Sequence, residues 1–548
     1  MQRSRSISVV FAAAFRNRTL LRLELAWAVF NGAEWGVWIA LLVYAYTHGG
    51  AAAASLIVIV QLAPCILLAP FLGVLTDRRR AGRVLFFSYL LMGLTMGGLA
   101  AAVAAGAPRL VVFALASLMN LAITTPRPAQ SSLLPGVVRS PLELSAANVV
   151  SSWMENGSVM IAPALTGVLL GIGGPSLAMT VLAIGCLVGA LIVWPIPGPP
   201  ALGRGDDDEA VSLVSEVRAG IKAVSDVPAV RTLVAVLGSQ YILVGALDVL
   251  YVVLAISVLG MGESGAGYLN SAFGIGGLVG AAVTATLVAR RRLAPALISG
   301  IVVAALAIGA LGLYPTVAGA FVLLAVAGLS RTVLDVTGRI LLQRSAPPGI
   351  IAQVFSLLES LMDTGLMLGA IFVPVLIGLS GARAALIGTS VLFLVIVAIA
   401  WRRLRTIDAT ADVPQVEIQL LKSIAIFAPL PAPELEGLAR ALEPVAAAAG
   451  ETVIREGDAG DCYYAIADGE VTVSRQGRQV AVLHRGDGFG EIALIENVPR
   501  TATVTATLDT ALYSLEKDEF LLAVTGHAPV ARAAGDLVAL RVSELEAL

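Results

Sequence analysis

Nine ionisable side chains interrupt the long apolar stretches that fill most of the first 410 residues of this 548-residue sequence. A charge in hydrocarbon is expensive to insert, so such residues usually face a cavity or a charged partner. They are Glu34, Arg127, Glu155, Asp248, Arg331, Asp335, Arg339, Glu359 and Asp363. These residue types predict ion pairing, proton coupling or cation recognition inside a membrane.

Their spacing favours pairing within each half of the region. Arg127 and Glu155 lie at similar depth in their helices, as do Arg331 and Asp363, if each residue rises about 1.5 Å. Arg331 also starts a run of three charges at i, i+4 and i+8, which share one helix face. A static structural network remains the alternative reading for the arginines.

Carboxyl groups outnumber arginines six to three in this set. Three carboxyls therefore lack an arginine, and a buried carboxyl without a partner tends to hold a proton. We select Glu34 and Asp248 as candidates for proton coupling or cation recognition.

Twelve apolar stretches must position these residues, and each is long enough to cross a bilayer, which takes about 20 residues in a helix. They run at about 22–46, 51–75, 84–105, 110–134, 145–171, 175–196, 229–259, 264–289, 293–314, 317–343, 352–379 and 381–403. The two sets of six, 22–196 and 229–403, are separated by the polar stretch 197–228. Both sets carry an acid in the first and fifth helix and an arginine in the fourth, so we predict an all-α polytopic membrane protein with a six-plus-six pseudo-repeat.

The composition divides the chain into two bodies. Residues 1–410 hold 26 Lys and Arg against 17 Asp and Glu, whereas residues 411–548 hold 10 against 21. Charged residues make up about 10% of the first part and about 22% of the second, which is close to the share in soluble domains. The three cysteines show no disulfide or zinc spacing. We therefore expect a lipid-embedded body, no metal site and a soluble acidic tail.

Lys and Arg are concentrated in the loops on one side of the predicted spans, and Arg109 and Arg383 alone occur on the other. The positive-inside rule predicts that both termini face the cytoplasm in a multi-pass protein of the inner (plasma) membrane. Residues 1–21 form a short N-terminal segment, in which we recognise no removable signal peptide.

Basic clusters follow the second helix of each half. The first reads Gly73-Val-Leu-Thr-Asp77-Arg78 with further arginines behind it. This loop resembles the signature of the major facilitator superfamily, G-x-L-x-D-R, and Pro128–Pro135 and Ala162–Gly167 look like its exporter branch.

The resemblance covers about residues 1–405 and implies two halves that rock around a midplane site. In physical terms the Asp77 carboxylate can pair with arginines across the two halves, which would make the segment with Asp77 and Arg78 a cytoplasmic latch; a charge cluster that only sets topology is the alternative. Arg80 and Ala162 replace glycines of the family patterns, and this weakens an assignment as antiporter.

The tail begins after a linker at 404–415, and residues 416–548 form the predicted second domain. Val416–Ile426 and Glu434–Leu442 have helical apolar spacing, and short alternating strands with glycine turns follow from Ala449. This pattern predicts an α+β domain, a small antiparallel β-roll flanked by helices.

Residues 489–504 read Phe-Gly-Glu-Ile-Ala-Leu-Ile-Glu-Asn-Val-Pro-Arg-Thr-Ala-Thr-Val. The run resembles the phosphate-binding cassette of cyclic-nucleotide-binding domains, F-G-E-x-A-L-x-x-x-x-P-R-x-A-T-V, and 450–471 resemble that family's opening strands. A surface ion pair or a cassette that no longer binds is the alternative.

The cassette resemblance implies a role for each of six residues. The N–H groups of Ile492 and Ala493, at the start of a short helix, meet a cyclic phosphate, and Arg500 neutralises it. Glu491 accepts from the ribose 2′-hydroxyl, and Gly490 allows close approach. Thr501 can bond guanine or phosphate; we favour cAMP as the regulatory ligand, with cGMP as the alternative.

The helix Val530–Leu545 should supply a lid over the base, through Leu537, Val538 or Leu540. Few residues follow the roll, and they form no basic patch, so we expect no nucleic-acid partner. The three histidines are scattered and no nucleophile with a base is evident, so we expect neither an enzyme nor a cofactor.

On these grounds we predict a secondary transporter, an exporter of a small amphipathic molecule such as a siderophore, lipid or drug, regulated by a cyclic nucleotide. The alternatives are a membrane-anchored nucleotide sensor without transport and an ungated exporter with a structural tail. The transported substrate and the oligomeric state stay open.

Overall fold

This computed structural model describes residues 17–77, 80–138, 141–194, 196, 220–222, 224–287, 292–347, 350–410 and 414–546. They divide into two compact units. The larger contains Thr19–Val137 and Ser151–Asp412, and the smaller contains Val413–Leu548 together with Val138–Val150.

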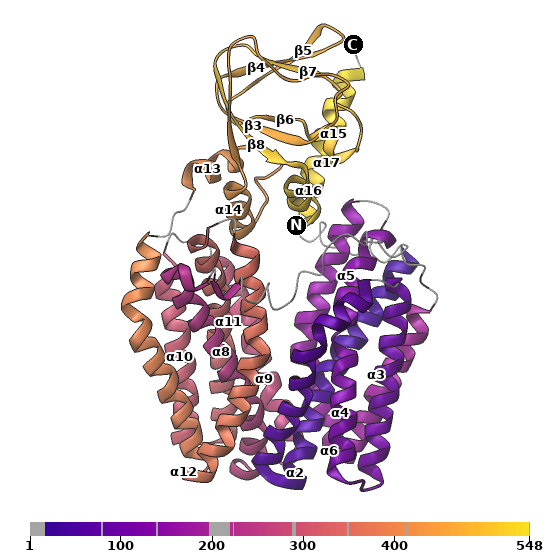
Figure 1. Cartoon of the computed structure of the whole chain (residues 1–548), viewed down its shortest axis with the longest axis vertical. Coiled ribbons are helices and arrows are strands. Elements are labelled where there is room, and N and C mark those ends of the chain that lie inside the picture. Colours follow the sequence, from indigo (N-terminus) through magenta and orange to yellow (C-terminus); the bar gives the residue numbers. More distant parts are fainter. Residues whose placement is uncertain are drawn as a thin grey trace. The chain divides into compact units, whose positions relative to one another are not determined.

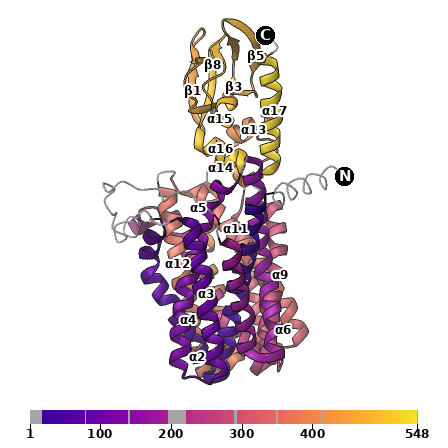
Figure 2. The ribbon, with the colours of Figure 1, turned by 90° about the vertical axis from the view of Figure 1, so that its right-hand side faces the viewer.

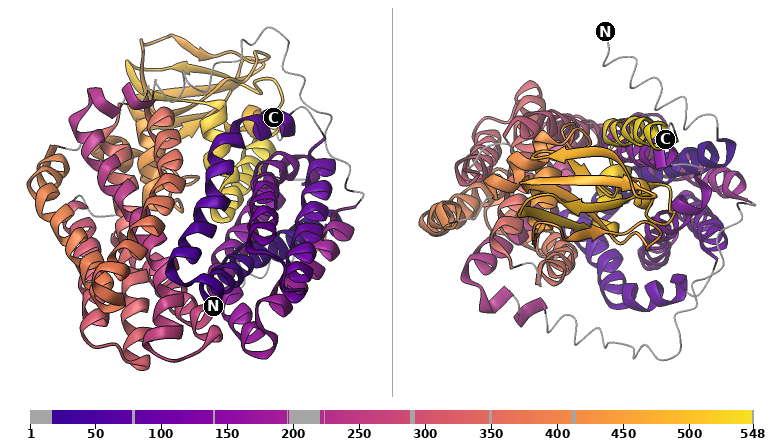
Figure 3. Two further views of the ribbon diagram at one scale, coloured as in Figure 1. Left: turned by 60° about the horizontal axis from the view of Figure 1, so that its bottom comes forward. Right: turned by 90° about the horizontal axis from the view of Figure 1, so that it is seen from above.

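Long apolar helices build the larger unit (Figure 1). In the first half they are α2 (Arg18–Asp77), α3 (Ala81–Ala104), α4 (Arg109–Ile123), α5 (Pro126–Val137) and α6 (Pro141–Val193). In the second half they are α8 (Pro228–Val253) with the π-helical turn η1 (Leu254–Val258), α9 (Glu263–Leu287), α10 (Ala294–Leu313), α11 (Val317–Ser345) and α12 (Ile351–Thr410). The two sets gather in two bundles, coloured indigo to purple and magenta to orange in Figure 3.

Nine helices among the described residues are long and apolar enough to cross a membrane, with α4 and α5 taken as one. Three of them, α2, α6 and α12, are double, because the helical path breaks at Gly49 and Gly50, at Gly173 and Gly174, and at Gly381. Gly50, Gly174 and Gly381 have φ of 66°, 67° and 81°, a region that glycine enters without strain. Nine helices, three of them double, give twelve membrane-length segments, as the sequence predicted.

Two segment boundaries differ from the prediction. The fourth apolar stretch is interrupted at Thr124 and Thr125, directly before Pro126, because a proline has no backbone N–H with which to continue the helix. The last helix continues to Thr410, so most of the stretch 404–415, which we expected to be a linker, is helical.

Glycines bring α6 and α9 together across the two halves. A Cβ on Gly267 would lie 2.3 Å from the Pro163 carbonyl oxygen, and the Ser271 hydroxyl donates to the Met160 carbonyl at 2.8 Å. Only residues without side chains permit such close backbone approach. The two halves are therefore in close contact along the segment of α6 around Met160 and Pro163.

The smaller unit holds two four-stranded antiparallel sheets, in the orders β1-β8-β3-β6 and β2-β7-β4-β5. The strands are β1 (Glu443–Ala447), β2 (Thr452–Ile454), β3 (Cys462–Asp468), β4 (Glu470–Arg475), β5 (Arg478–His484), β6 (Gly488–Phe489), β7 (Thr503–Ala506) and β8 (Thr510–Glu516). The first strand thus begins at Glu443, before the Ala449 that the sequence suggested.

Helices flank these sheets: α13 (Gln415–Ser423), α14 (Ala432–Arg440), α15 (Glu491–Ile495), α16 (Lys517–Thr525) and α17 (Ala528–Glu546). The last of them runs alongside the strands in Figure 2. A buried aromatic group of Phe427, Tyr463 and Phe520 holds the helices on the sheet, with Tyr463 and Phe520 stacked at 4.8 Å between ring centroids.

Candidate functional site

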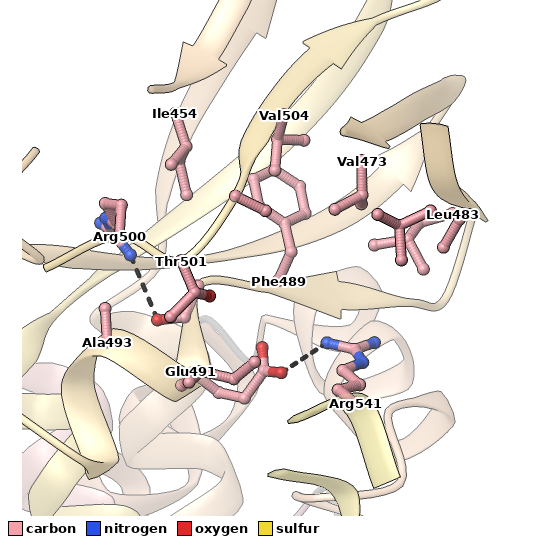
Figure 4. A pocket seen from close by; sticks show the side chains of 15 residues that line it. Ile454, Val473, Leu483, Phe489, Glu491, Ala493, Arg500, Thr501, Val504 and Arg541 are labelled. Atoms are coloured by element: carbon pink, nitrogen blue, oxygen red, sulfur yellow. Dashed lines mark hydrogen bonds and ion pairs between the residues drawn. The ribbon is translucent and has the colours of Figure 1, made fainter. Parts of the chain in front are cut away.

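A cavity of about 660 Å³, partly open to solvent, lies in the smaller unit where α15 meets both sheets (Figure 4). Its wall combines aliphatic side chains from β2, β4, β5 and β7 with polar groups from the segment that surrounds α15. All six residues that the sequence singled out line it: Gly490, Glu491, Ile492, Ala493, Arg500 and Thr501.

Arg500 is the buried cation of this cavity, with a side chain only 4% exposed. Its Nη1 donates to the Gly490 carbonyl at 3.1 Å, and its Nη2 donates to the Cys462 carbonyl at 2.8 Å. Nη2 also pairs with the Asp461 carboxylate at 2.9 Å, and that acidic side chain is 79% exposed. Two backbone carbonyls therefore hold the guanidinium in place. The exposed Asp461 carboxylate can leave it for solvent, so that another anion can take its place.

Gly490 is the residue before α15, and its backbone has φ of 96°. A Cβ at this position would lie 2.7 Å from Arg500 Nη1 and 3.1 Å from the Cys462 carbonyl oxygen. Both the left-handed backbone and the lack of space therefore require glycine here.

Glu491 lies at the start of α15, and its side chain is 2% exposed. Its Oε1 accepts from Arg541 Nη1 at 2.7 Å, whereas its Oε2 is buried without a hydrogen-bond partner among the described residues. A buried acceptor without a donor is unfavourable by about 1–3 kcal/mol. This oxygen is consequently available to a hydroxyl group of a ligand.

Arg541 belongs to α17 and was not predicted as a site residue. Besides Glu491 it bonds the Gly488 carbonyl at 2.8 Å. Burial alone would lower the pKa of Arg541, but the adjacent Glu491 carboxylate raises it above its ordinary value. The one feature of the sequence that pointed to Arg541 is its charge within the predicted lid helix. Its partner Glu491 lies 50 residues away, so the sequence alone did not indicate the pair.

Val538 is the predicted lid residue that packs beside the cavity. It is 5% exposed and clusters with Ile492 and Ala502, which line the cavity wall. Leu540, by contrast, is 56% exposed, and Leu537 packs against the aromatic core instead. The cavity thus offers a cation, an unpaired carboxylate oxygen and an apolar wall, a combination suited to a ligand with an anionic group, a hydroxyl and a flat apolar ring.

The charged residues of the larger unit form one network in each half. In the first half Arg127 bridges two carboxylates, Glu34 Oε2 at 2.7 Å and Glu155 Oε1 at 2.5 Å. Its guanidinium also lies 5.6 Å from the Trp27 ring centroid. The expected approach of Arg127 and Glu155 is present, but Glu34, which we expected to be without an arginine, shares the same cation.

In the second half Arg339 occupies the bridging position. It pairs with Asp335 at 3.2 Å on its own helix and with Glu359 of α12 at 3.0 Å. Tyr241 accepts from its Nη2 at 2.8 Å, and Gln240 donates to Asp335 at 2.6 Å. Charges on α11 and α12 therefore alternate as predicted, although through Arg339 and Glu359.

Arg331 and Asp363, which we expected to pair, form no ion pair in the described part of the chain, and Arg331 Nε is buried without a hydrogen-bond partner. Asp248 is 7% exposed, and Trp38 of the other half lies near its carboxylate. The expected latch cannot be placed: Arg78 lies outside the described residues, and of Asp77 only its position at the end of α2 is described.

Glu24 is a buried carboxylate that sequence reasoning missed. It is 2% exposed, and both its oxygens lie 2.8 Å from the Ser151 hydroxyl of α6. Its position near the start of α2, two residues after Arg22, is typical of a charge at the membrane surface and gives no sign of burial.

Comparison with known proteins addresses both units. The sequence model described as Cyclic nucleotide-binding domain matches residues 444–525. The cAMP-dependent protein kinase regulatory subunit of Yarrowia lipolytica is 42% identical over 102 residues, which are 18% of this chain and 27% of the relative. That of Dictyostelium discoideum is 36% identical over 121 residues, 21% of this chain and 37% of the relative.

The chain thus spans well under half the length of these relatives. A solved structure, the regulatory domain of Toxoplasma gondii PKA with cAMP, is 35% identical, and the match covers 20% of this chain and 42% of that one with a TM-score of 0.19. The sequence model described as Major Facilitator Superfamily matches residues 25–359. The protein therefore belongs to the major facilitator superfamily and carries a C-terminal cyclic-nucleotide-binding domain.

Proposed function

We propose that this protein is a secondary transporter whose alternating access is regulated by a cyclic nucleotide, with cAMP favoured, bound in the cavity of the smaller unit. The observation that carries the proposal is the pair formed by the buried Arg500 and the unpartnered Glu491 Oε2 in one cavity. The larger unit supplies the transport path.

In the proposed complex the cyclic phosphate takes the place of Asp461 on Arg500, whose planar donor fork suits two phosphate oxygens. The N–H groups of Ile492 and Ala493 approach the same phosphate. The ribose 2′-hydroxyl donates to Glu491 Oε2 and gives this buried oxygen the donor that it lacks. Each contact uses a group that the described chain already holds in position.

The names of the relatives favour cAMP over cGMP, whereas Thr501 does not distinguish the two. The curated relatives that match this part of the chain are named cAMP-dependent protein kinase regulatory subunits. Thr501 lines the cavity, and its hydroxyl can serve either a phosphate or a guanine. Titration with both nucleotides decides between them.

The transport proposal follows from the partly exposed charges of both halves. Arg127, Glu155 and Glu359 have side chains that are 41%, 45% and 51% exposed, although they lie within membrane-length helices. We infer a solvent-filled path between the halves, and export of a small amphipathic molecule along it. Protonation of Glu34 would break its ion pair with Arg127, and this offers a means of proton coupling.

The proposed membrane is the plasma membrane, with both termini in the cytoplasm, where a cyclic nucleotide is available. Transport driven by a pH gradient should fail in Glu34→Gln and in Asp248→Asn if these carboxyls carry the coupling proton. Full uphill transport in both variants would remove protons from the mechanism.

Binding is tested by calorimetry on the purified full-length chain. Arg500→Ala should weaken cAMP binding about a hundred-fold, because a charge-assisted contact contributes up to about 3 kcal/mol. Arg478→Ala removes an exposed arginine of the same domain and is the matched control. No binding to the wild type would refute the proposal.

Regulation needs a second measurement. A thermal-shift screen of lipids, siderophores and drugs, with and without cAMP, identifies the substrate for flux assays in proteoliposomes. Flux should depend on cAMP in the wild type and be independent of it in Arg500→Ala. If cAMP binds but flux never responds, the tail is structural; if cAMP binds and no substrate is moved, the protein is an anchored sensor.

A further inference from the structure

Three arginines of the larger unit line a groove that the proposed function does not use. Arg402 and Arg405 come from the last turns of α12, and Arg292 stands just before α10. The groove encloses about 1170 Å³, part of it open to solvent, and its wall also includes Trp401.

The groove carries excess positive charge. All three arginines are exposed, and none forms an ion pair with another described residue. Asp408 is the one acid in the lining; it is 6% exposed, and its Oδ1 accepts the Leu293 N–H at 2.7 Å. Three cations and one committed carboxylate leave a net charge of about +2 in the groove.

The groove lies at the end of its helices where lipid headgroups are expected. Twelve crossings return the chain to the side on which α2 begins, and the last turns of α12 and the start of α10 both lie at that end of their helices. Trp401 is 43% exposed beside the arginines, and tryptophan is enriched at this depth of a membrane.

An apolar stripe leads from the hydrocarbon toward the groove. Val391, Val395 and Ile399 are 51%, 47% and 75% exposed and precede Arg402 at helical spacing, so they share its face of α12. A free anion would gain nothing from such a stripe, whereas an acyl chain below a phosphate would bury it.

From these observations we propose that the groove binds the headgroup phosphate of an anionic phospholipid in the adjacent leaflet, with an acyl chain along the stripe on α12. Basic pockets between helices at the membrane surface are suited to such headgroups. The site is separate from the nucleotide cavity, and its test does not depend on nucleotide binding.

Native mass spectrometry of the full-length protein in mixed micelles measures the retention of phosphatidylglycerol against phosphatidylcholine. The wild type should retain phosphatidylglycerol preferentially. Each arginine near the surface contributes about 1 kcal/mol, so Arg402→Gln with Arg405→Gln should weaken that binding roughly thirty-fold. Arg292→Gln, which leaves α12 intact, should weaken it about five-fold.

Arg403→Gln is the matched control, because Arg403 is exposed on the same helix but does not line the groove. It should retain wild-type binding. An equal loss in Arg403→Gln, or equal retention of both lipids by the wild type, would overturn the proposal, since either result means that only diffuse charge is involved.

The source of the phosphate is tested separately by thermal shift. Phosphatidylglycerol should raise the melting temperature of the wild type, and millimolar inorganic phosphate should not. Ile399→Ser, which removes part of the stripe and no charge, should reduce the lipid effect. Equal stabilisation by inorganic phosphate and an unchanged response of Ile399→Ser would show a free-anion site and refute the lipid assignment.

Discussion

Glu491 divides its carboxylate between two tasks. Oε1 accepts from Arg541, and Oε2 is buried and has no donor in the described chain. Breaking such a pair leaves a buried charge uncompensated, which makes Arg541 a positioning residue for the acceptor that faces the ligand. The chemistry of the cavity therefore depends on a pair contributed by two separate helices, α15 and α17.

Glu491→Gln should reduce the affinity for cAMP by about ten- to a hundred-fold, because a hydrogen bond to a charged acceptor contributes about 1.5–3 kcal/mol. A comparison with 2′-deoxy-cAMP isolates the cause. The wild type should bind the deoxy analogue much more weakly than cAMP, whereas the variant should barely distinguish them.

Glu496→Gln, an exposed acid just after α15, controls for the change in net charge. If Glu491→Gln still discriminates the two nucleotides as the wild type does, the carboxylate does not meet the 2′-hydroxyl, and the proposed orientation of the ribose is wrong.

Gly490→Ala should impair both folding and binding. A left-handed backbone is unfavourable by about 1–2 kcal/mol for a residue with a Cβ, and here the Cβ would also lie 2.7 Å from Arg500 Nη1. Gly477→Ala separates the two effects, because Gly477 has φ of 80° with no atom within 4 Å of its Cβ. Both variants should melt earlier in thermal denaturation, but calorimetry should show weaker cAMP binding in Gly490→Ala alone.

Among single residues, the sequence predicted the site residues that belong to one local motif and missed the ion pairs between residues far apart in the chain. Six residues of the segment 490–501 line one cavity because they lie just before, within and just after a short helix. Arg541 and Asp461 were not predicted as site residues, because nothing in the sequence around them indicates a partner 39 or 50 residues away. The prediction that Glu34 lacks an arginine is wrong for the same reason, because one arginine pairs with two acids from different helices.

At the scale of elements, α17 closes the cavity with an apolar contact as well as with Arg541. Val538→Ala removes about 1–2 kcal/mol of buried apolar contact with Ile492 and Ala502. It should therefore weaken cAMP binding by up to about ten-fold, as measured by calorimetry. Leu540→Ala, on the exposed face of the same helix, should leave affinity unchanged; a matching loss there would mean that α17 acts only through overall stability.

The sequence predicted the helices correctly where their length and their breaks depend on neighbouring residues alone. Apolar length predicted twelve membrane segments, and glycines mark the three breaks inside α2, α6 and α12. The prediction of a linker from residue 404 is wrong. The charged residues around this position favoured a linker, but Leu404 and Ile407 are buried and continue the helical pattern. Tertiary packing, which a sequence does not display, extends the helix to Thr410.

The whole molecule joins a transport body to a binding domain, and regulation requires that the free energies of the two be linked. Suppose that a saturating nucleotide changes the equilibrium constant between the two conformations of the halves by some factor. The affinities of the two conformations for the nucleotide must then differ by that same factor. Fixing the halves in one conformation is therefore a test of regulation that needs no knowledge of the substrate.

Gly171 of α6 and Ser264 of α9 allow the halves to be fixed in the conformation described above. A Cβ on Gly171 would lie 3.4 Å from the Ser264 Cβ, close to the range of about 3.5–4.5 Å found in disulfides. Oxidation of Gly171→Cys with Ser264→Cys, in a Cys462→Ser background to prevent mispairing, should stop transport and change the dissociation constant of cAMP by at least about five-fold. Dithiothreitol should reverse both effects, and the single-cysteine variants should show neither. Complete cross-linking with an unchanged affinity for cAMP would mean that the nucleotide domain does not sense the halves.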